Sequence, residues 1–324
     1  MIVVGTKSGV QVFEREGPEW NHRFTSLDGI TVYSVAADPG VPGRVYAAAR
    51  ENGLYESDDY GETWTHTAPN LNVWSFGVAP TGTVYAGVSP SAIYQRTPEG
   101  AWDLVSSLQD QPAYGSWSFP VAPHIPNIRH ITFSANDPHA VYSAVEVGGV
   151  IVSGDDGATW ANHREGLHLD VHCLVSAPGD EDVLYAATGR GFYRSFNAGA
   201  VWESAVTGMR SMYLTPLVAH SKQPHTLVTC ATQGRPRYWR ERASGAEATI
   251  YRSRDGGDRW EPIMNGLPET LVGAIDTFVV DPDEPEALYG ATADGKVLVS
   301  TSFGDEWQVL AEGLPAAFGI AVVA

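Results

Sequence analysis

Short apolar or alternating segments, bounded by turn residues, recur along the whole chain. Residues 44–49 and 53–56 form one such pair; a more apolar segment precedes the pair and a tryptophan follows it. Segments of this length, rich in β-branched and aromatic residues, predict β-strands. We label the four strands of each unit A to D in chain order. The chain is therefore expected to be all-β.

Octapeptides that end in tryptophan mark the repeat. Three are close copies of one another, at residues 57–64 (SDDYGETW), 153–160 (SGDDGATW) and 253–260 (SRDGGDRW), and two are partial, at residues 195–202 and 300–307. The tryptophans in this frame are Trp20, Trp64, Trp102, Trp160, Trp202, Trp260 and Trp307. Successive spacings are 44, 38, 58, 42, 58 and 47 residues. This is the period of a four-stranded propeller blade.

The octapeptide predicts a tight turn between strands C and D. Its Asp accepts hydrogen bonds from nearby backbone N–H groups, its Gly supplies a left-handed backbone angle, and its Trp wedges between adjacent sheets. The motif resembles the Asp-box, or BNR, repeat of sialidases, xyloglucanases, sortilin-type receptors and the photosystem II assembly factor. Because those proteins include hydrolases, receptors and assembly factors, the resemblance implies a propeller architecture and leaves the activity open.

Seven blades are expected to close into one ring that spans residues 1–324 as a single domain. Residues 2–5, 10–13 and 20–24 match strands B, C and D, whereas residues 317–323 match a lone strand A, so the two ends complete one blade. Closure of this kind removes unpaired sheet edges. The remaining A strands align at residues 32–35, 73–76, 128–131, 171–174, 214–217 and 275–278. Pro216 is compatible with an edge strand that borders the channel.

Composition limits the partners and the compartment. The net charge of −18 opposes binding to nucleic acid or anionic lipid, and no apolar run is long enough to cross a bilayer. Cys173 and Cys230 lie in apolar strands and are expected to be reduced core residues. The first residues lack a basic leader and a cleavage site, so we expect a cytoplasmic protein.

Two insertions indicate which face of the ring carries function. Both 58-residue spacings arise from extra residues, at 108–127 in a D-to-A connection and at 231–248 in a B-to-C connection. In a propeller these connections share one face, which we call the top, while the octapeptide turns lie on the bottom. Insertions in repeat proteins gather on the binding face. The tryptophans outside the repeat frame, Trp74, Trp117 and Trp239, also map to the top, where they either contact a ligand or anchor the insertions.

Polar residues are predicted to surround the top mouth of the channel. The second position of each A strand gives Tyr33, Trp74, Arg129, His172, Thr215, Asp276 and Phe318. Charged groups without partners are costly to bury, so such a ring favours a binding role. The candidate catalytic residues are Glu146, His172 and Asp276, and the candidate substrate-binding residues are Arg129, Arg190, Tyr33, Trp74, Tyr213, Arg235, Arg237, Trp117 and Trp239.

These residues suit acid–base chemistry, but a purely structural role for them is also open. Glu146 follows an apolar stretch, which tends to raise a carboxyl pKa, and arginines hold carboxylates or phosphates through forked hydrogen bonds. Alternatively, Glu146 and Arg129 form a structural ion pair within one blade. We expect no cofactor; a transition metal at His130 and His172 is disfavoured because neither an HExxH helix nor paired CxxC motifs occur.

Two function classes remain open from sequence. The first is an enzyme of hydrolase or lyase type that acts on a small anionic, sugar-like or aromatic substrate in the top funnel, and it is favoured because the insertions resemble walls around a small ligand. The second is a non-catalytic scaffold that presents its face to a protein partner. The catalytic residues of the resembling enzymes do not transfer, since sialidases have six blades and xyloglucanases use a cleft between two propellers.

Overall fold

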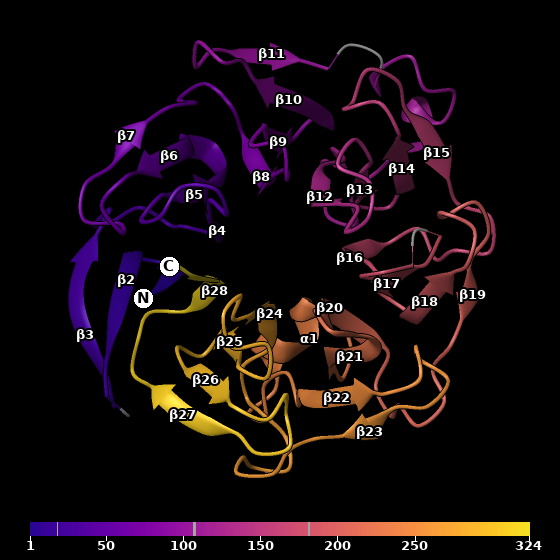
Figure 1. The fold of residues 1–324 in the computed structure, drawn as a ribbon. Helices are drawn as coiled ribbons and strands as arrows, with labels where there is room; N and C mark the ends of the chain where they lie inside the picture. The colour runs from indigo at the N-terminus through magenta and orange to yellow at the C-terminus, as the bar shows by residue number, and fades with distance from the viewer. Residues whose placement is uncertain (18, 106–107, 181) are drawn as a thin grey trace.

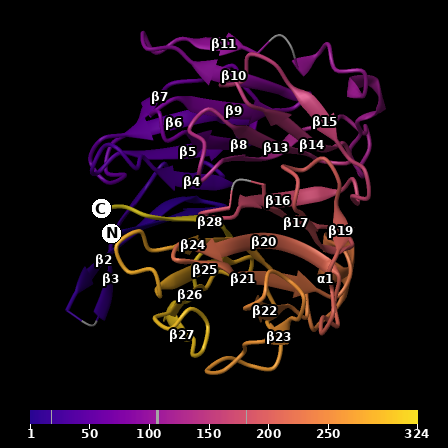
Figure 2. The same cartoon turned by 45° about the vertical axis from the view of Figure 1, so that its right-hand side comes forward.

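The computed structural model describes residues 1–17, 19–105, 108–180 and 182–324, and it also leaves the side chain of Arg240 undescribed. Within these residues, seven four-stranded antiparallel sheets are arranged around a central channel (Figure 1). In the view turned by 45°, neighbouring sheets lie side by side around the ring (Figure 2). The predicted seven-bladed propeller is therefore confirmed.

Each blade contributes one strand to each of four concentric layers. The innermost strands are β4 (Ser34–Ala37), β8 (Val73–Val78), β12 (Ile128–Phe133), β16 (Val171–Ser176), β20 (Tyr213–His220), β24 (Ile275–Val280) and β28 (Ala317–Val322). The second layer is β5 (Val45–Ala49), β9 (Val84–Val88), β13 (Val141–Val145), β17 (Leu184–Thr188), β21 (Gln223–Thr232), β25 (Leu288–Thr292) and β1 (Ile2–Thr6). The third layer is β6 (Gly53–Ser57), β10 (Ala92–Arg96), β14 (Gly149–Ser153), β18 (Gly191–Ser195), β22 (Thr249–Ser253), β26 (Val297–Ser300) and β2 (Gly9–Glu16). The outer layer is β7 (Thr65–His66), β11 (Trp102–Leu104), β15 (Ala161–His163), β19 (Glu203–Ser204), β23 (Glu261–Pro262), β27 (Gln308–Ala311) and β3 (Glu19–Ser26).

The second layer forms the most completely buried part of the core. Strands β5, β9, β13, β17 and β25 are buried at every position, because each is covered on both faces by a neighbouring blade. Small residues dominate these strands, as in Val45–Ala49 (VYAAA), and allow the sheets to approach closely. The second residue of each of these strands is a buried tyrosine.

The closing blade joins the two ends of the chain. β28 pairs antiparallel with β1, with Ile2 opposite Val322 and Val4 opposite Ile320. At the end of the ladder the amino group of Met1 donates to the carbonyl of Val323 at 2.7 Å, and the Val323 N–H donates to the carbonyl of Met1 at 2.8 Å. The ring is thus held shut by backbone hydrogen bonds, as the sequence predicts.

The octapeptide turns are held by their own side chains. In residues 153–160, the Ser153 hydroxyl donates to Asp155 at 2.8 Å and accepts the Gly157 N–H at 2.8 Å. Asp155 also accepts the N–H and the hydroxyl of Thr159, and these bonds lower the pKa of its carboxyl. Two successive residues, Asp156 and Gly157, have positive φ. The same network recurs at Ser57 and Ser253.

The tryptophans that end these turns pack between blades. Trp260 lies edge-on to Phe192 of the preceding blade, with ring centroids 4.9 Å apart. Trp20, which is in the same repeat frame but outside the octapeptides, lies edge-on to Tyr289 at 5.9 Å. The tryptophan rings therefore belong to the core, and the octapeptides lie on the opposite face from the insertions.

Both cysteines are free and buried.

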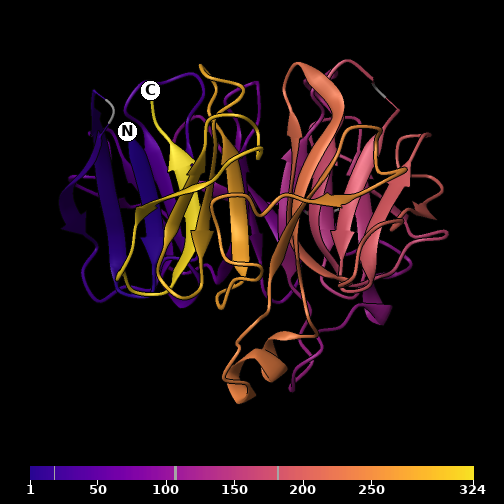
Figure 3. The ribbon, with the colours of Figure 1, turned by 90° about the horizontal axis from the view of Figure 1, so that it is seen from below.

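The two insertions project from the same face of the disc. Figure 3 shows the short helix α1 (Pro236–Glu241) and the loop before β12 extending together from one side, while both chain ends lie at the other. The first insertion carries a 3₁₀ turn, η3 (Tyr114–Ser116), and a further one, η1 (Arg50–Asn52), joins β5 to β6. None of the helices in the described part of the chain is long and apolar enough to span a membrane.

Candidate functional site at the mouth of the channel

A β-bulge aims the second residue of nearly every inner strand at the channel. In β8, β12, β16, β24 and β28 the pairing register shifts across this position, and in β20 it shifts across the third and fourth residues, Thr215 and Pro216. A bulged residue lacks a ladder partner and bends its strand, which re-aims its side chain. In β20 the bulge includes Pro216, whose missing N–H is therefore not needed for pairing. Tyr33 occupies the same place just before β4, which begins two residues later than the sequence pattern predicts.

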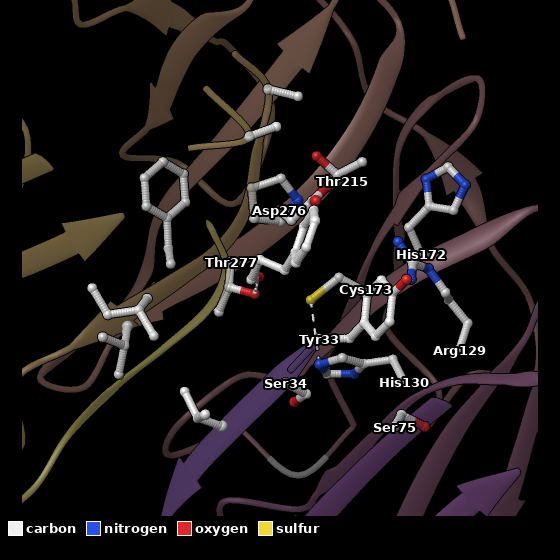
Figure 4. Close-up of a pocket in the computed structure, with 18 of the residues that line it drawn as sticks. Tyr33, Ser34, Ser75, Arg129, His130, His172, Cys173, Thr215, Asp276 and Thr277 are labelled. Carbon is white, nitrogen blue, oxygen red and sulfur yellow. Dashed lines mark hydrogen bonds between the residues drawn. The ribbon is translucent and has the colours of Figure 1, made fainter. Parts of the chain in front are cut away.

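The channel is one cavity of about 2120 Å³ that passes from the insertions on the top face to the loops on the bottom face. Ten of the twelve candidate residues line it: Tyr33, Trp74, Arg129, Glu146, His172, Tyr213, Arg235, Arg237, Trp239 and Asp276. Figure 4 shows several of them around a common space, with Asp276 and Thr215 facing Arg129 and His172 across it. Arg190 is exposed and Trp117 is buried in the core, and neither lines the cavity.

Arg50 is held between two aromatic rings at the mouth. Its guanidinium carbon lies 3.9 Å from the ring centroid of Tyr33 and 4.0 Å from that of Trp74. Phe318 stacks on Tyr33, and Phe119 from the first insertion packs edge-on against Trp74. Burial and nearby Arg129 lower the pKa of Arg50 to about 10. The Arg50 side chain makes no hydrogen bond or ion pair with any described residue, and its Nε is buried without a partner.

Two carboxylates flank Arg129. Its Nε lies 3.5 Å from Oε2 of Glu146, which is only 8% exposed, so the ion pair considered from sequence is present. Burial lowers the pKa of Arg129, but the charges of Glu146 and Asp276 outweigh it and raise that pKa. Burial raises the pKa of the Asp276 carboxyl, and the positive charges of Arg129 and Arg50 oppose this increase. The mouth therefore combines cations with an acid that is inclined to keep its proton.

His172 faces Asp170, a residue that sequence reasoning did not select. The Nδ1 of His172 lies 2.5 Å from the carbonyl oxygen of Leu214, and its Nε2 lies 3.3 Å from Oδ1 of Asp170. Neither Nε2 nor Oδ1 has a partner in hydrogen-bond geometry among the described residues. The ring of Tyr213 packs 4.8 Å from that of His172, and burial raises the pKa of the Tyr213 hydroxyl.

The wall below the mouth is structural. His130 accepts the Leu174 N–H at 3.4 Å and lies 3.6 Å from the sulfur of Cys173. Burial lowers the pKa of His130 to about 4 and raises that of Cys173 to about 11, so both groups are neutral near pH 7. Side-chain hydroxyls join three pairs of neighbouring inner strands: Ser75 donates to the Ile128 carbonyl at 2.7 Å, Thr215 to the Ile275 carbonyl at 2.6 Å and Thr277 to the Phe318 carbonyl at 2.9 Å.

The insertions contribute unequally to the mouth. Trp239 lines the cavity, packs edge-on against Tyr213 and donates from its indole to the carbonyl of Gly234. Arg235 and Arg237 are exposed at the rim, and Arg237 pairs with Glu241 along α1. Trp117 instead packs with Tyr114 in the core between blades, as its structural alternative predicts, and so anchors the first insertion.

Comparisons with known proteins identify the fold. A GH74 xyloglucanase from Xanthomonas campestris superposes with a TM-score of 0.71 at 16% sequence identity, covering 96% of this chain and 52% of its own. A GH74 enzyme from Niastella koreensis superposes with a TM-score of 0.68 at 14% identity, covering 99% of this chain and 51% of its own. YCF48 bound to a D1 peptide superposes with a TM-score of 0.56 at 13% sequence identity, covering 95% of this chain and 83% of its own. The chain thus spans about half the length of these two GH74 proteins. No protein-family model and no curated protein matches it.

Proposed function

We propose that this chain binds a small anionic ligand at the top mouth of its channel and hydrolyses it by acid–base chemistry. The observation that supports this most directly is the unpartnered guanidinium of Arg50 between Tyr33 and Trp74. The two rings fix its plane, so its N–H edge is available for a carboxylate or phosphate, which guanidinium binds through forked hydrogen bonds. Preorganisation of this kind lowers the entropic cost of binding.

The groups around Arg50 fit the two proton transfers of a hydrolysis. Asp276 has its pKa raised by burial and lies on one side of the mouth, where it donates a proton to the leaving group. Glu146, which directly follows β13, and His172 on β16 of the next blade supply the acceptor that takes a proton from the attacking water. Arg129 and Arg50 stabilise negative charge on the ligand. The similarity to xyloglucanases is consistent with a hydrolase on this fold but transfers no residue role.

Binding is tested first. A thermal-shift and calorimetric screen of small carboxylates, phosphate esters and uronic acids should return at least one ligand, and Arg50→Met should weaken it by ten-fold or more, about 1.4 kcal/mol. Arg50→Lys keeps the charge but loses the fork, so an intermediate loss is expected. Arg254→Met removes an exposed arginine in an octapeptide turn and should bind like the wild type. A folded Arg50→Met protein with unchanged affinity would contradict the proposal.

Catalysis is tested separately on the ligands that bind. With chromogenic esters, phosphoesters and glycosides of the bound anion, Asp276→Asn should abolish turnover and change affinity by less than three-fold. This outcome would assign proton donation to Asp276. Tight binding without turnover of any of these compounds would instead leave a binding protein.

A second candidate function is the binding of a polypeptide. Exposed apolar side chains surround the same mouth, namely Val121 at 62%, Val272 at 56% and Tyr238 at 48% exposure, and all three border the cavity. YCF48, which shares the fold, was solved with a peptide bound. Val121→Asp and Val272→Asp should weaken binding of an acidic peptide but leave binding of a small anion unchanged. Equal loss of both ligands would mean that they share one subsite.

A further inference from the structure

Three buried side chains next to the proposed anion site form a compact donor set. Glu146 directly follows β13, Asp170 directly precedes β16, and His172 is the bulged residue of β16. Their exposures are 8%, 6% and 4%, and one donor atom from each lies within 4.8 Å of the others. All three also line the channel cavity. The set is therefore enclosed by protein but open to the channel.

The hydrogen bond to Leu214 fixes the tautomer of His172. A carbonyl oxygen can only accept, so Nδ1 of His172 must carry the proton that it shares with Leu214. In the neutral ring Nε2 then carries a lone pair, and this lone pair faces the carboxylate oxygen of Asp170 at 3.3 Å. Two buried acceptors that face each other are unfavourable unless a proton, which would make His172 an imidazolium paired with Asp170, or a metal ion lies between them.

We propose that Glu146, Asp170 and His172 bind a divalent first-row transition metal ion, of the zinc, manganese or cobalt class. Metal ligands at roughly 2.0–2.2 Å from an ion are separated by about 3.3–3.6 Å along a tetrahedral edge and about 2.8–3.1 Å along an octahedral edge, so the 3.3 Å between Nε2 and Oδ1 matches tetrahedral coordination. The Nδ1–H bond to a carbonyl is the outer-shell contact usual for a metal-binding histidine. An imidazole in the set disfavours Mg²⁺ and Ca²⁺.

The remaining ligand distances and charges agree with a three-ligand site. Separations of up to 4.8 Å need a small rotation of Glu146, whose Oε2 pairs at 3.5 Å with Arg129 while its other oxygen remains available. The two carboxylates offset the charge of a divalent ion, whereas Arg129 and the more distant Arg50 and Arg235 oppose it. Three protein ligands leave a coordination position toward the cavity, as in catalytic zinc sites.

A metal ion at Glu146, Asp170 and His172 differs from the expectation of no metal drawn from the sequence, and it changes how a proton would leave the attacking water in the proposed reaction. With an ion bound, Glu146 and His172 would be ligands, and the ion would lower the pKa of a coordinated water so that its proton passes to solvent and no side-chain acceptor is needed. His130, the partner suggested by sequence, is not part of the donor set within the described residues, because it is bonded to Leu174 and lies against Cys173. The metal site and the Arg50 site use different side chains, so each can fail without the other.

The experiment measures metal binding directly. Protein stripped with a chelator is titrated with Zn²⁺, Mn²⁺, Co²⁺ and Mg²⁺ by calorimetry, and Co²⁺ binding is also followed by visible absorption. We expect one equivalent of a transition ion and no Mg²⁺. Asp170→Asn, which keeps the size of the side chain, should weaken binding by at least ten-fold, and His172→Gln should do the same. His139→Gln, which changes an exposed histidine on the bottom face, should bind metal like the wild type, and Arg50→Met, which removes an opposing positive charge, should bind it at least as tightly.

A second measurement guards against misfolded variants. In wild-type protein, ¹⁵N chemical shifts of His172 should show one protonated nitrogen and a change at Nε2 when Zn²⁺ is added. Two protonated nitrogens, with no change on addition of Zn²⁺, would mean that a His172–Asp170 ion pair occupies the site and would overturn the proposal. Metal binding that survives in folded Asp170→Asn would overturn it as well. Loss of anion binding in Arg50→Met with metal binding intact would leave the two proposals independent.

Discussion

The burial of His130 gives the fold a specific sensitivity to acid. Its folded-state pKa of about 4 lies below the ordinary value of 6.5, so the unfolded chain takes up a proton first as the pH falls. The contribution of His130 to stability is therefore complete above pH 6.5 and is lost as the pH falls toward 4, with a total of about 3 kcal/mol. Urea unfolding between pH 7.5 and 4.5 should show a shallower decline for His130→Gln than for wild type. Parallel curves would contradict this assignment.

A single alanine in an octapeptide turn is predicted to be replaceable with a gain in stability. Ala198 has a φ of 53°, a conformation that costs a side chain with Cβ about 1 kcal/mol and that costs glycine little. Ala198→Gly should therefore raise the unfolding free energy by about 0.5–1 kcal/mol in chemical denaturation. Ala200→Gly, at an exposed position without a positive φ, should lower it. A loss of stability in both variants would mean that the left-handed strain is absorbed elsewhere.

Individual site residues were predictable where the repeat frame placed them. Arg129, His172 and Asp276 occupy the second position of an inner strand, and the bulge at that position brings all three to the channel. Asp170 was missed because it lies one residue before its strand, outside the aligned frame. Arg50 was also missed, because its packing between two rings depends on Tyr33 and Trp74 from different blades, which no local pattern shows.

Among the elements, the octapeptide turn depends on its serine hydroxyl, which both donates and accepts a hydrogen bond within the turn. Ser153 Oγ is bonded to the Asp155 carboxylate and to the Gly157 N–H in a buried position. Ser153→Ala leaves that N–H unsatisfied, which costs about 1–3 kcal/mol. Thermal and urea unfolding should show this loss, whereas Ser8→Ala, at an exposed position, should change stability by less than about 0.5 kcal/mol. A neutral Ser153→Ala would mean that water replaces the hydroxyl.

Element boundaries followed the sequence most closely where a strand is buried on both faces. The second-layer strands, such as Val141–Val145, are continuous apolar runs and were easy to recognise. The inner strand β4 was placed two residues early, because Val32 and Tyr33 are apolar and bonded to neighbouring backbone but lie outside the strand. Helix α1 was not anticipated, since it lies in an insertion without apolar periodicity and begins at a proline.

At the scale of the whole molecule, the sequence determines the ring more fully than it determines what the ring does. Seven tryptophans in one frame and matching ends are sufficient for the topology, because each blade repeats the same local solution. The channel is different, since residues from every blade meet there and each position is unique. Its chemistry depends on contacts between strands that are far apart in sequence, such as Glu146 with Arg129 from one blade and His172 from the next.

The closure by β28 gives a prediction for the entire ring. Deleting residues 317–324 removes the buried side chains of Ile320 and Val323 and exposes the edges of β1 and the neighbouring inner strands. The lost burial corresponds to about 5 kcal/mol or more, and Tm should fall by roughly 10 °C with self-association through the open edges. Calorimetry and light scattering measure both effects.

A circular permutant supplies the matched control for this truncation. Because the Met1 amino group lies 2.7 Å from the carbonyl of Val323, a short Gly-Ser linker can join the native ends, and new ends can be opened in the exposed turn at residues 80–82 between β8 and β9. The permutant then closes its ring through β8 and β9 in the same way that the native chain closes through β28 and β1. It should remain monomeric and melt within a few degrees of the wild type. If the truncated chain also melted at the wild-type temperature, pairing of β28 with β1 would not be what holds the ring shut. If the permutant failed to fold, the blades would not be equivalent as places to close the ring.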